Sequence, residues 1–220
     1  MSCPIEISNF ISTIKEGTFG GCSNIPSIKL GNSLEKIEEG AFGNCQNLSE
    51  IELPTSLKEI GKRAFAYCMN ISSIEIPRNV NTIETGAFKE CNKLSSIKFC
   101  GSVKKIGSGA FEDLYNFDKT YISCSEDPYD ADDYAFDISG YNTKLLVPFG
   151  TKKIYEVTKG WKKFKKIEES ELASGLKDIK TVNEIETYYK LNGAVSKPET
   201  KKGILIEKYK NGRTRKIIKQ

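Results

Sequence analysis

The chain of 220 residues contains no histidine, and this absence excludes more functions than any other feature of its composition. Ser-His-Asp and Cys-His catalytic arrangements need an imidazole, and so do the HExxH motif and the zinc sites with histidine ligands. A Ser-Lys pair or a pair of carboxylates is still chemically available, but no motif supports either. We therefore expect a noncatalytic protein that holds no metal and no cofactor.

Long apolar runs are also missing. No stretch reaches the roughly 18 consecutive apolar residues that a membrane-spanning helix needs. The N-terminal stretch MSCPIEISNF has no basic start followed by an apolar segment, so no signal peptide is visible. Apolar residues make up 38% of the chain, which is enough for one or two compact units with a core.

The net charge of +4 conceals two halves of opposite sign. Residues 144–220 hold 20 Lys+Arg and 9 Asp+Glu, which leaves +11, whereas residues 1–143 hold 13 and 20, which leaves −7. This difference in composition predicts two units. The basic segment 197–219 has Tyr209 as its only aromatic residue, and binding of single-stranded nucleic acid uses several stacking aromatics. We therefore expect no nucleic-acid partner.

What the sequence does contain is a repeat with a period of 23 residues. Five phenylalanines follow this spacing, namely Phe19, Phe42, Phe65, Phe88 and Phe111. Four cysteines recur with the same period, namely Cys22, Cys45, Cys68 and Cys91. A fixed period over several copies indicates a repeat architecture, in which each unit buries its apolar side against the next.

One copy of the repeat shows how each coil is expected to fold. Residues 51–53 (Ile-Glu-Leu) alternate between apolar and polar, which predicts a short strand with one buried face. Pro54 ends this strand because proline cannot donate a ladder hydrogen bond. Leu57 and Ile60 then line the opposite wall. Coils stacked about 4.8 Å apart pair their strands and close a continuous core.

The stacking of coils also explains the cysteines that recur every 23 residues. A residue that recurs once per coil points the same way in every coil, so the four cysteines form a ladder of small buried side chains beside the phenylalanines. Adjacent thiols are close enough for a disulfide but poorly oriented, and their spacing is unlike CxxC, so we expect reduced thiols that pack. Cys100 and Cys124 stand outside the ladder, one coil apart, and a disulfide between them is left open.

The pattern IxxGAFxxCxxLxxIxLPxSLxxI resembles the BspA-like subclass of leucine-rich repeats, which is found on bacterial surface proteins. Residues 14–37, 37–60, 60–83 and 83–106 match it almost column for column. The resemblance implies a mainly β fold with short helical turns: a leucine-rich-repeat solenoid of about five 23-residue coils.

Two places depart from this pattern. Arg63 stands where the other corners have glycine, so we expect that corner to differ slightly. In the fifth coil, Thr120 takes the place of the strand isoleucine, and SEDPYDADDY is inserted before Ala135-Phe136.

The solenoid is predicted to occupy residues 1–169 and to end in a helical cap, because an uncapped last coil would expose its core. Within the cap, Thr151 is expected to cap a helix, and an apolar stripe follows at Trp161, Phe164 and Ile167. The polar residues 170–184 are expected to be a linker.

Residues 185–220 are predicted to form a small three-stranded β module. Asn211-Gly212 between two apolar runs is a strong hairpin signal. The stretch YYKLNGAVSKPETKKGILIEKYKNGRTRKIIKQ resembles the short C-terminal modules of secreted Bacteroidetes proteins, and this resemblance implies a role in export or surface attachment. An ordinary structural sheet is the alternative.

The outward positions of the strands form two rows on one face, of the kind that repeat proteins use to bind partners. The rows comprise Ser27, Lys29, Glu50, Glu52, Ser73, Glu75, Ser96, Lys98 and Tyr121. The family resemblance implies a secreted or cell-surface protein that binds an extracellular protein or glycan, such as host matrix or other cells. We expect this protein to be a monomer.

Two other functions are left open. One is an accessory module that binds polysaccharide, and the other is a glycoside hydrolase with Glu52 and Glu75 as a carboxylate pair about 5–9 Å apart in a pocket. The acidic insert is also a candidate calcium site, but counted from Asp130 it lacks the glycine and glutamate of an EF-hand loop, so we expect a solvated loop. The insert's carboxylates are Asp127, Asp130, Asp132, Asp133 and Asp137.

Overall fold

The computed structural model describes residues 5–115, 119–139 and 142–173, and the backbone of four strands between residues 185 and 219. The chain divides into two compact units, residues 1–175 and 176–220. Most of the predicted linker lies outside the described residues, so the division into 1–169, 170–184 and 185–220 remains a prediction.

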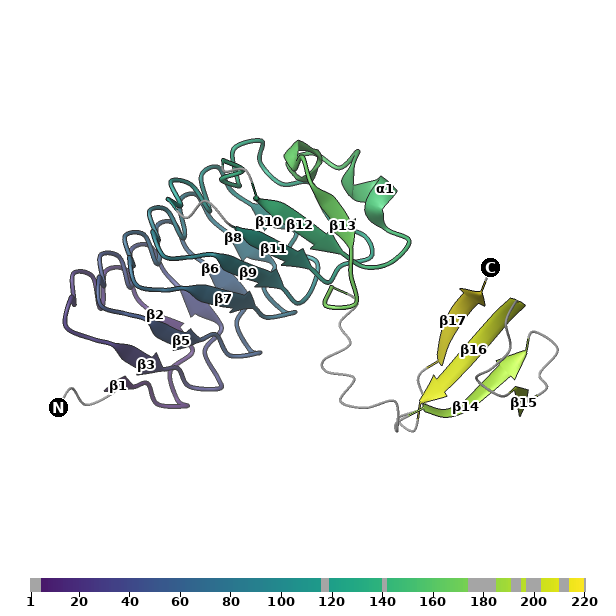
Figure 1. Cartoon of the computed structure of the whole chain (residues 1–220). Helices are drawn as coiled ribbons and strands as arrows, with labels where there is room; N and C mark the ends of the chain where they lie inside the picture. Colours follow the sequence, from purple (N-terminus) through teal and green to yellow (C-terminus); the bar gives the residue numbers. More distant parts are fainter. Residues whose placement is uncertain are drawn as a thin grey trace. The chain divides into compact units, whose positions relative to one another are not determined.

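The first unit is a solenoid of about seven turns, in which each turn contributes a strand to one wall (Figure 1). These first-wall strands are parallel and form two sheets, with the orders β1-β3-β5 and β13-β12-β11-β9-β7. They are β1 (Ile5–Glu6), β3 (Ser27–Lys29), β5 (Glu50–Glu52), β7 (Ser73–Ile76), β9 (Ser96–Phe99), β11 (Thr120–Ser123), β12 (Lys144–Val147) and β13 (Ile167–Glu169). The solenoid is longer than the five predicted coils because strand pairing continues through β12 and β13, after the 23-residue period has ended.

The second wall is a single five-stranded parallel sheet with the order β10-β8-β6-β4-β2. Each of its strands has two residues, of which the second is a buried isoleucine. They are β2 (Thr13–Ile14), β4 (Lys36–Ile37), β6 (Glu59–Ile60), β8 (Thr82–Ile83) and β10 (Lys105–Ile106). The chain therefore returns along the opposite wall at Ile60, as the sequence predicts.

The coils pair in register, so that a residue lies beside its equivalent one period away. Ile28 pairs with Ile51, and Ile74 pairs with Ile97. This register places like side chains in columns, and the alternation along each strand sends every second side chain into the core. Strand β7 ends at Ile76, directly before Pro77, as expected for a residue that cannot donate to the ladder.

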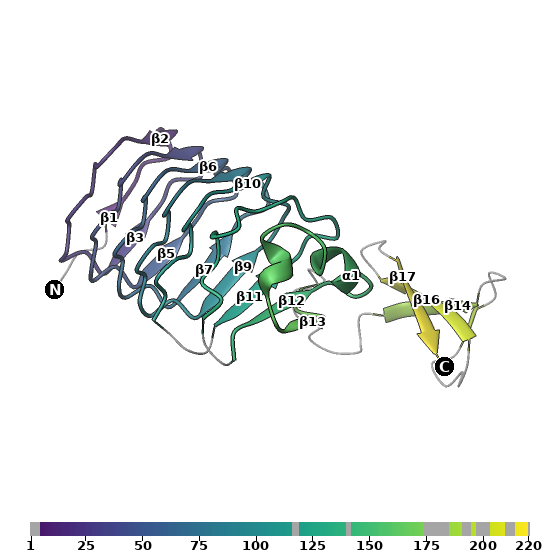
Figure 2. The ribbon, with the colours of Figure 1, turned by 90° about the horizontal axis from the view of Figure 1, so that it is seen from above.

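Figure 2 shows the ribbon of the successive coils from above, and a stack of phenylalanine rings runs through the core of these coils from Phe19 to Phe111. Successive ring centroids lie 5.1–5.2 Å apart, and the ring planes differ by 4–9°. Backbone hydrogen bonds join the coils at the same level, since Phe42 N–H donates to Ala64 O at 2.8 Å and Phe65 N–H to Ala87 O at 2.8 Å. The phenylalanine rings and the backbone thus share one repeat distance, which is the spacing between adjacent coils.

The corner at Arg63 keeps the geometry of the other corners, contrary to our expectation. The equivalent glycines have φ between 58° and 64°, and Arg63 has φ of 52°. The intercoil hydrogen bond of this corner is also kept, because Arg63 N–H donates to Thr85 O at 3.0 Å. A residue with a Cβ atom is disfavoured at positive φ, so stacking between neighbouring coils holds Arg63 in a strained conformation.

Exposed ion pairs connect adjacent coils with the same spacing. Among the described residues, seven of them join residues 23 positions apart, with N–O distances of 2.7–3.3 Å: Lys15–Glu38, Lys29–Glu6, Lys36–Glu59, Lys58–Glu35, Lys62–Glu39, Lys89–Glu112 and Lys98–Glu75. Exposed pairs contribute little to stability because water and salt screen them. Their main effect is to favour the correct register, since a slip would separate the opposite charges.

The C-terminal end of the solenoid differs in part from the predicted helical cap. The helix α1 (Lys152–Tyr155) and the short 3₁₀ turn η1 (Trp161–Lys163) are present, but Ile167 begins strand β13. The Thr151 hydroxyl does not cap α1 and donates to Pro148 O at 2.7 Å instead. Trp161 and Phe164 are buried, so the apolar stripe covers the core although it is not one helix.

The second unit is an antiparallel sheet with the order β15-β14-β16-β17. Its strands are β14 (Ile185–Lys190), β15 (Val195–Ser196), β16 (Gly203–Tyr209) and β17 (Thr214–Lys219). Strands β16 and β17 pair as the predicted hairpin. The three-stranded prediction missed β15, because a strand of two residues is too short to show a period.

Replacing Arg63 with glycine is expected to stabilise the solenoid. Glycine adopts positive φ without a steric cost, so Arg63→Gly should raise the free energy of unfolding by about 1 kcal/mol. Equilibrium denaturation in urea measures the change. The control is Lys93→Gly, at an exposed turn residue outside the positive-φ positions, and it should lower stability. Equal effects of both substitutions would contradict the assignment of strain to Arg63.

Candidate functional site

The cysteine ladder lies inside the solenoid. Cys22, at the first coil, is half-buried, and the other three cysteines are fully buried. Each buried thiol donates a hydrogen bond to the carbonyl of the phenylalanine 26 residues earlier, at 3.1–3.2 Å: Cys45 to Phe19, Cys68 to Phe42 and Cys91 to Phe65. The thiols therefore fill space and satisfy backbone carbonyls at once.

The ladder raises the pKa of two of its buried thiols, whereas the hydrogen bond with Cys68 lowers the pKa of Cys45. Burial raises the pKa of Cys91 to about 12. The hydrogen bond with Cys45, together with burial, raises the pKa of Cys68. Because the thiolate is the nucleophile and the metal ligand, these positions are unsuited to either chemistry. Cys100 and Cys124, outside the ladder, are partly exposed and are also thiols in this structure.

The predicted binding rows lie side by side on the outer face of the first wall. Glu50 pairs in register with Ser27, and Glu52 with Lys29. Eight of the nine predicted residues are exposed or half-buried: Ser27, Lys29, Glu50, Glu52, Ser73, Glu75, Ser96 and Lys98. We call these eight residues the strand face.

Charges on the strand face are unevenly compensated. Lys29 pairs with Glu6 at 3.0 Å, and Lys98 with Glu75 at 3.2 Å. Among the described residues, neither Glu50 nor Glu52 belongs to an ion pair, and both are exposed. Strand β5 therefore presents two carboxylates to an approaching partner.

The placement of Tyr121 on this face was wrong. Tyr121 is fully buried, its ring packs edge-on against Phe111, and its hydroxyl donates to Asp137 O at 3.2 Å. The strand register explains the error, since Thr120 pairs with Ser96 and Tyr121 with Ile97. The fifth coil is one residue longer than the period, so Tyr121, not Thr120, takes the place of the strand isoleucine.

The acidic insert uses its carboxylates to shape the chain. Asp132 accepts from Tyr134 N–H at 2.9 Å, and Asp130 accepts from Lys159 N–H at 3.2 Å. Asp137 accepts from Leu114 N–H at 2.9 Å. Within the residues that the structure describes, no group of three histidine, cysteine or acidic side chains is arranged to hold a metal ion.

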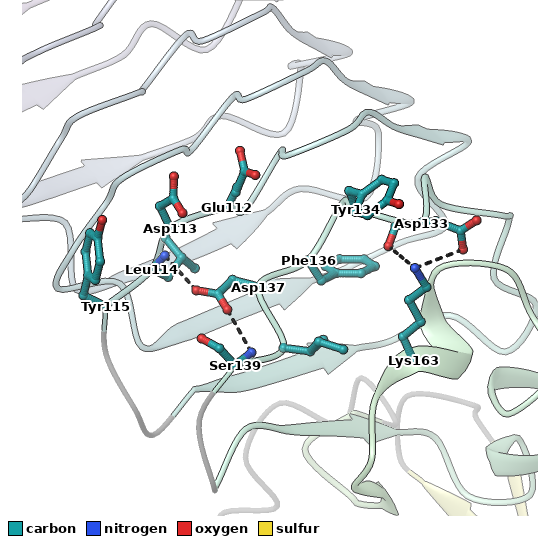
Figure 3. A pocket seen from close by; sticks show the side chains of 11 residues that line it. Glu112, Asp113, Leu114, Tyr115, Asp133, Tyr134, Phe136, Asp137, Ser139 and Lys163 are labelled. Atoms are coloured by element: carbon teal, nitrogen blue, oxygen red, sulfur yellow. Dashed lines mark hydrogen bonds and ion pairs between the residues drawn. The ribbon is translucent and has the colours of Figure 1, made fainter.

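Cavities open on the described part of the solenoid. One, of about 550 Å³, lies between the fifth coil and the insert (Figure 3). Another, of about 590 Å³, lies at the first coils around Phe10 and Lys29. Neither cavity is lined by Glu52 or Glu75, so neither is the pocket that the hydrolase hypothesis requires around these two carboxylates.

The sequence interpretation did not identify the first cavity. Its two exposed tyrosines, Tyr115 and Tyr134, lie where the repeat ends, so the repeat columns did not predict their positions. The available signal was the insert itself, which lengthens the spacing from Phe111 to Phe136 to 25 residues. Insertions in repeat proteins often lie on a binding face.

The repeated coils also match a known family. A family model for the BspA type leucine-rich repeat region matches residues 4–118 in six copies, which is more than half of the chain. The protein belongs to the BspA-type leucine-rich repeat family.

Several solved structures of bacterial leucine-rich repeat proteins are similar to this BspA-type chain. The pneumococcal vaccine antigen PcpA is 19% identical, with a TM-score of 0.66, over 76% of this chain and 41% of its own. The T. pallidum leucine-rich repeat protein is 31% identical, with a TM-score of 0.46, over 53% of this chain and 51% of its own. A leucine-rich cell surface protein of Faecalibacterium prausnitzii is 21% identical, with a TM-score of 0.37, over 78% of this chain and 61% of its own.

The likeness to PcpA shows a shared solenoid fold. The BspA-type chain spans less than two thirds of the length of each of these three structures. No curated protein matches it. In the described part of the chain, no helix is long and apolar enough to cross a membrane.

The buried thiols predict a specific pH dependence of stability. The unfolded chain releases a thiol proton near pH 8.5, whereas folded Cys91 retains it up to about pH 12. Unfolding therefore releases this proton within that window, and the free energy of unfolding falls as the pH rises through it. In Cys91→Ala, the free energy of unfolding should depend less steeply on pH between about pH 9 and pH 11. We expect its slope to be shallower by the equivalent of about one proton. Urea denaturation across this pH range measures the slope.

The control for this experiment is Leu94→Ala, which removes a fully buried apolar side chain that does not titrate. It should lower stability at every pH without changing the slope. Parallel curves for Cys91→Ala and the unmodified protein would show that the Cys91 thiol titrates equally in both states, which is incompatible with its burial.

Proposed function

We propose that the protein is a noncatalytic binding protein of the bacterial cell surface, and that the strand face engages an extracellular protein partner such as a host matrix protein or a protein on another cell. The observation that carries the proposal is the pair of exposed, uncompensated carboxylates, Glu50 and Glu52, on β5, the last strand of the in-register parallel sheet β1-β3-β5.

The geometry of the strand face supports this assignment. Repeat proteins bind partners over extended surfaces, because every coil adds an equivalent position to the same face. Residues i and i+2 of a strand point to the same side, so Glu50 and Glu52 face one partner together. Two adjacent carboxylates favour a partner surface that carries lysine or arginine, since complementary charges guide the encounter and set the register.

The proposed location rests on the family and its neighbours. BspA-type leucine-rich repeat proteins are usually surface or adhesion proteins. The similar structure from Faecalibacterium prausnitzii is described as a cell surface protein. A role of the C-terminal sheet in export or attachment is part of the same proposal.

Charge reversal on strand β5 tests the proposal. Glu50→Lys combined with Glu52→Lys places two like charges against a basic partner surface, which should weaken binding by about tenfold or more. The measurement is a solid-phase titration against purified extracellular-matrix glycoproteins at low and at physiological salt. The unmodified protein should bind at least one of them saturably at physiological salt.

A matched control reverses the same amount of charge elsewhere. Glu16→Lys with Glu126→Lys changes two exposed carboxylates outside the strand face, and it should leave the affinity unchanged. If both double variants bind like the unmodified protein, or if binding exists only at low salt, the strand face is not the binding surface.

A further inference from the structure

The cavity beside the insert is not part of the strand face and plays no role in the proposal made for that face. It lies between residues 112–115 of the fifth coil, residues 133–139 and Lys163 of η1 (Figure 3). Its volume of about 550 Å³ falls within the range of about 300–1,000 Å³ that is typical of small-molecule sites. Asp113 continues a column of positive-φ corner residues, so the cavity opens at a corner of the coil and not on the strand face.

The floor of the cavity is apolar and rigid. Phe136, one of its lining residues, is only 8% exposed and is enclosed by aromatic rings on several sides. Its ring centroid lies 4.6 Å from that of Trp161, 5.4 Å from that of Phe164 and 6.1 Å from that of Phe111. A ligand therefore meets a preformed surface and does not have to order it.

Two tyrosine rings stand exposed on either side of the cavity, as Figure 3 shows for Tyr115 and Tyr134. Tyr115 is 64% exposed and Tyr134 is 72% exposed. Tyr121 and Tyr155, by contrast, are fully buried in the same part of the solenoid. Exposed aromatic rings that flank a cavity provide stacking surfaces with little conformational entropy to lose.

The carboxylates of the cavity are already held in place by lysines and backbone amides. Lys89 lies 2.8 Å from Glu112 and 3.1 Å from Asp113. Asp137 accepts from Ser139 N–H at 2.8 Å and lies 3.4 Å from the buried ammonium of Lys119.

Lys163 donates to Asp133 O at 2.7 Å, lies 3.6 Å from the Asp133 carboxylate and sits 4.9 Å from the centre of the Tyr134 ring. The four carboxylates around the cavity are thus matched by three ammonium groups, which leaves one net negative charge. The site is close to neutral and keeps oriented oxygen acceptors.

From this combination we propose that the cavity binds a neutral glycan, with sugar rings against Tyr115 and Tyr134. The apolar C–H faces of a sugar pack on aromatic rings, and its hydroxyls donate to carboxylates, which are strong acceptors when held in a fixed orientation. A cationic peptide would compete with the lysines already paired to these carboxylates. An aliphatic ligand would bury the same carboxylates without replacing their hydrogen bonds to water.

Titration with soluble oligosaccharides tests this site. The probes are hexasaccharides of the malto, cello, chito and manno series, with a sulfated heparin hexasaccharide as the anionic comparison. Trp161 is the only tryptophan of the chain and packs under the floor, so its fluorescence reports occupancy, and calorimetry gives the affinity. We expect saturable binding of at least one neutral series and none of the sulfated one, because the net charge of the site is negative.

Substitution of the tyrosines then ties binding to the cavity. Tyr115→Ala and Tyr134→Ala should each weaken binding by about tenfold, and the double variant should abolish it. Both residues are exposed, so the melting temperature should hardly change. Tyr129→Ala is the matched control, since Tyr129 is 51% exposed but does not line the cavity, and its contact with Trp161 uses the backbone carbonyl.

Three results would overturn the proposal: no binding of any neutral series, binding that survives in the Tyr115→Ala and Tyr134→Ala double variant, or preferential binding of a lysine-rich peptide that is lost in this variant. The Glu50→Lys and Glu52→Lys variant should retain glycan binding. Failure of the glycan site and failure of the strand-face proposal are therefore distinguishable.

Discussion

The register between successive coils is the constraint on which the other features of the solenoid depend. A 23-residue period sets Ile28 beside Ile51 and stacks the phenylalanine rings 5.1–5.2 Å apart, so both walls and the core share one repeat distance. Each coil alone exposes its apolar side, and only the neighbouring coils bury it. Stability therefore resides in the interfaces between coils, which also explains why Arg63 is held at positive φ, where the equivalent corners have glycine.

The same register separates structural from functional positions. Inward-facing columns hold identical or similar residues, and three of the four cysteines in their column are fully buried and donate to backbone carbonyls. Outward positions differ from coil to coil, and they carry the uncompensated carboxylates of strand β5. The end of the strict period creates a third kind of environment, where the insert and the fifth coil enclose a cavity with exposed tyrosines. The two proposed binding sites thus lie on outward positions of the repeat and at the point where the strict period ends.

The repeat made most of the fold predictable, because each column was observed several times. Phe65 and Cys68 could be placed in the core from spacing alone, and the two walls followed from the alternation around Ile51. Tyr121 was misplaced because one extra residue shifted the register at a point without further copies for comparison. Tyr115 and Tyr134 were missed because their placement around one cavity depends on how the insert folds back, and no local pattern encodes that placement.

The most direct test of the account is amide hydrogen exchange on Phe65→Ala. This substitution interrupts the ring stack in its middle, next to the hydrogen bonds Phe42 N–H to Ala64 O and Phe65 N–H to Ala87 O. If the coils stabilise one another through the shared register, protection should fall together in the coils of Phe42, Phe65 and Phe88. Loss of protection confined to the coil of Phe65 would contradict the claim that stability resides between coils.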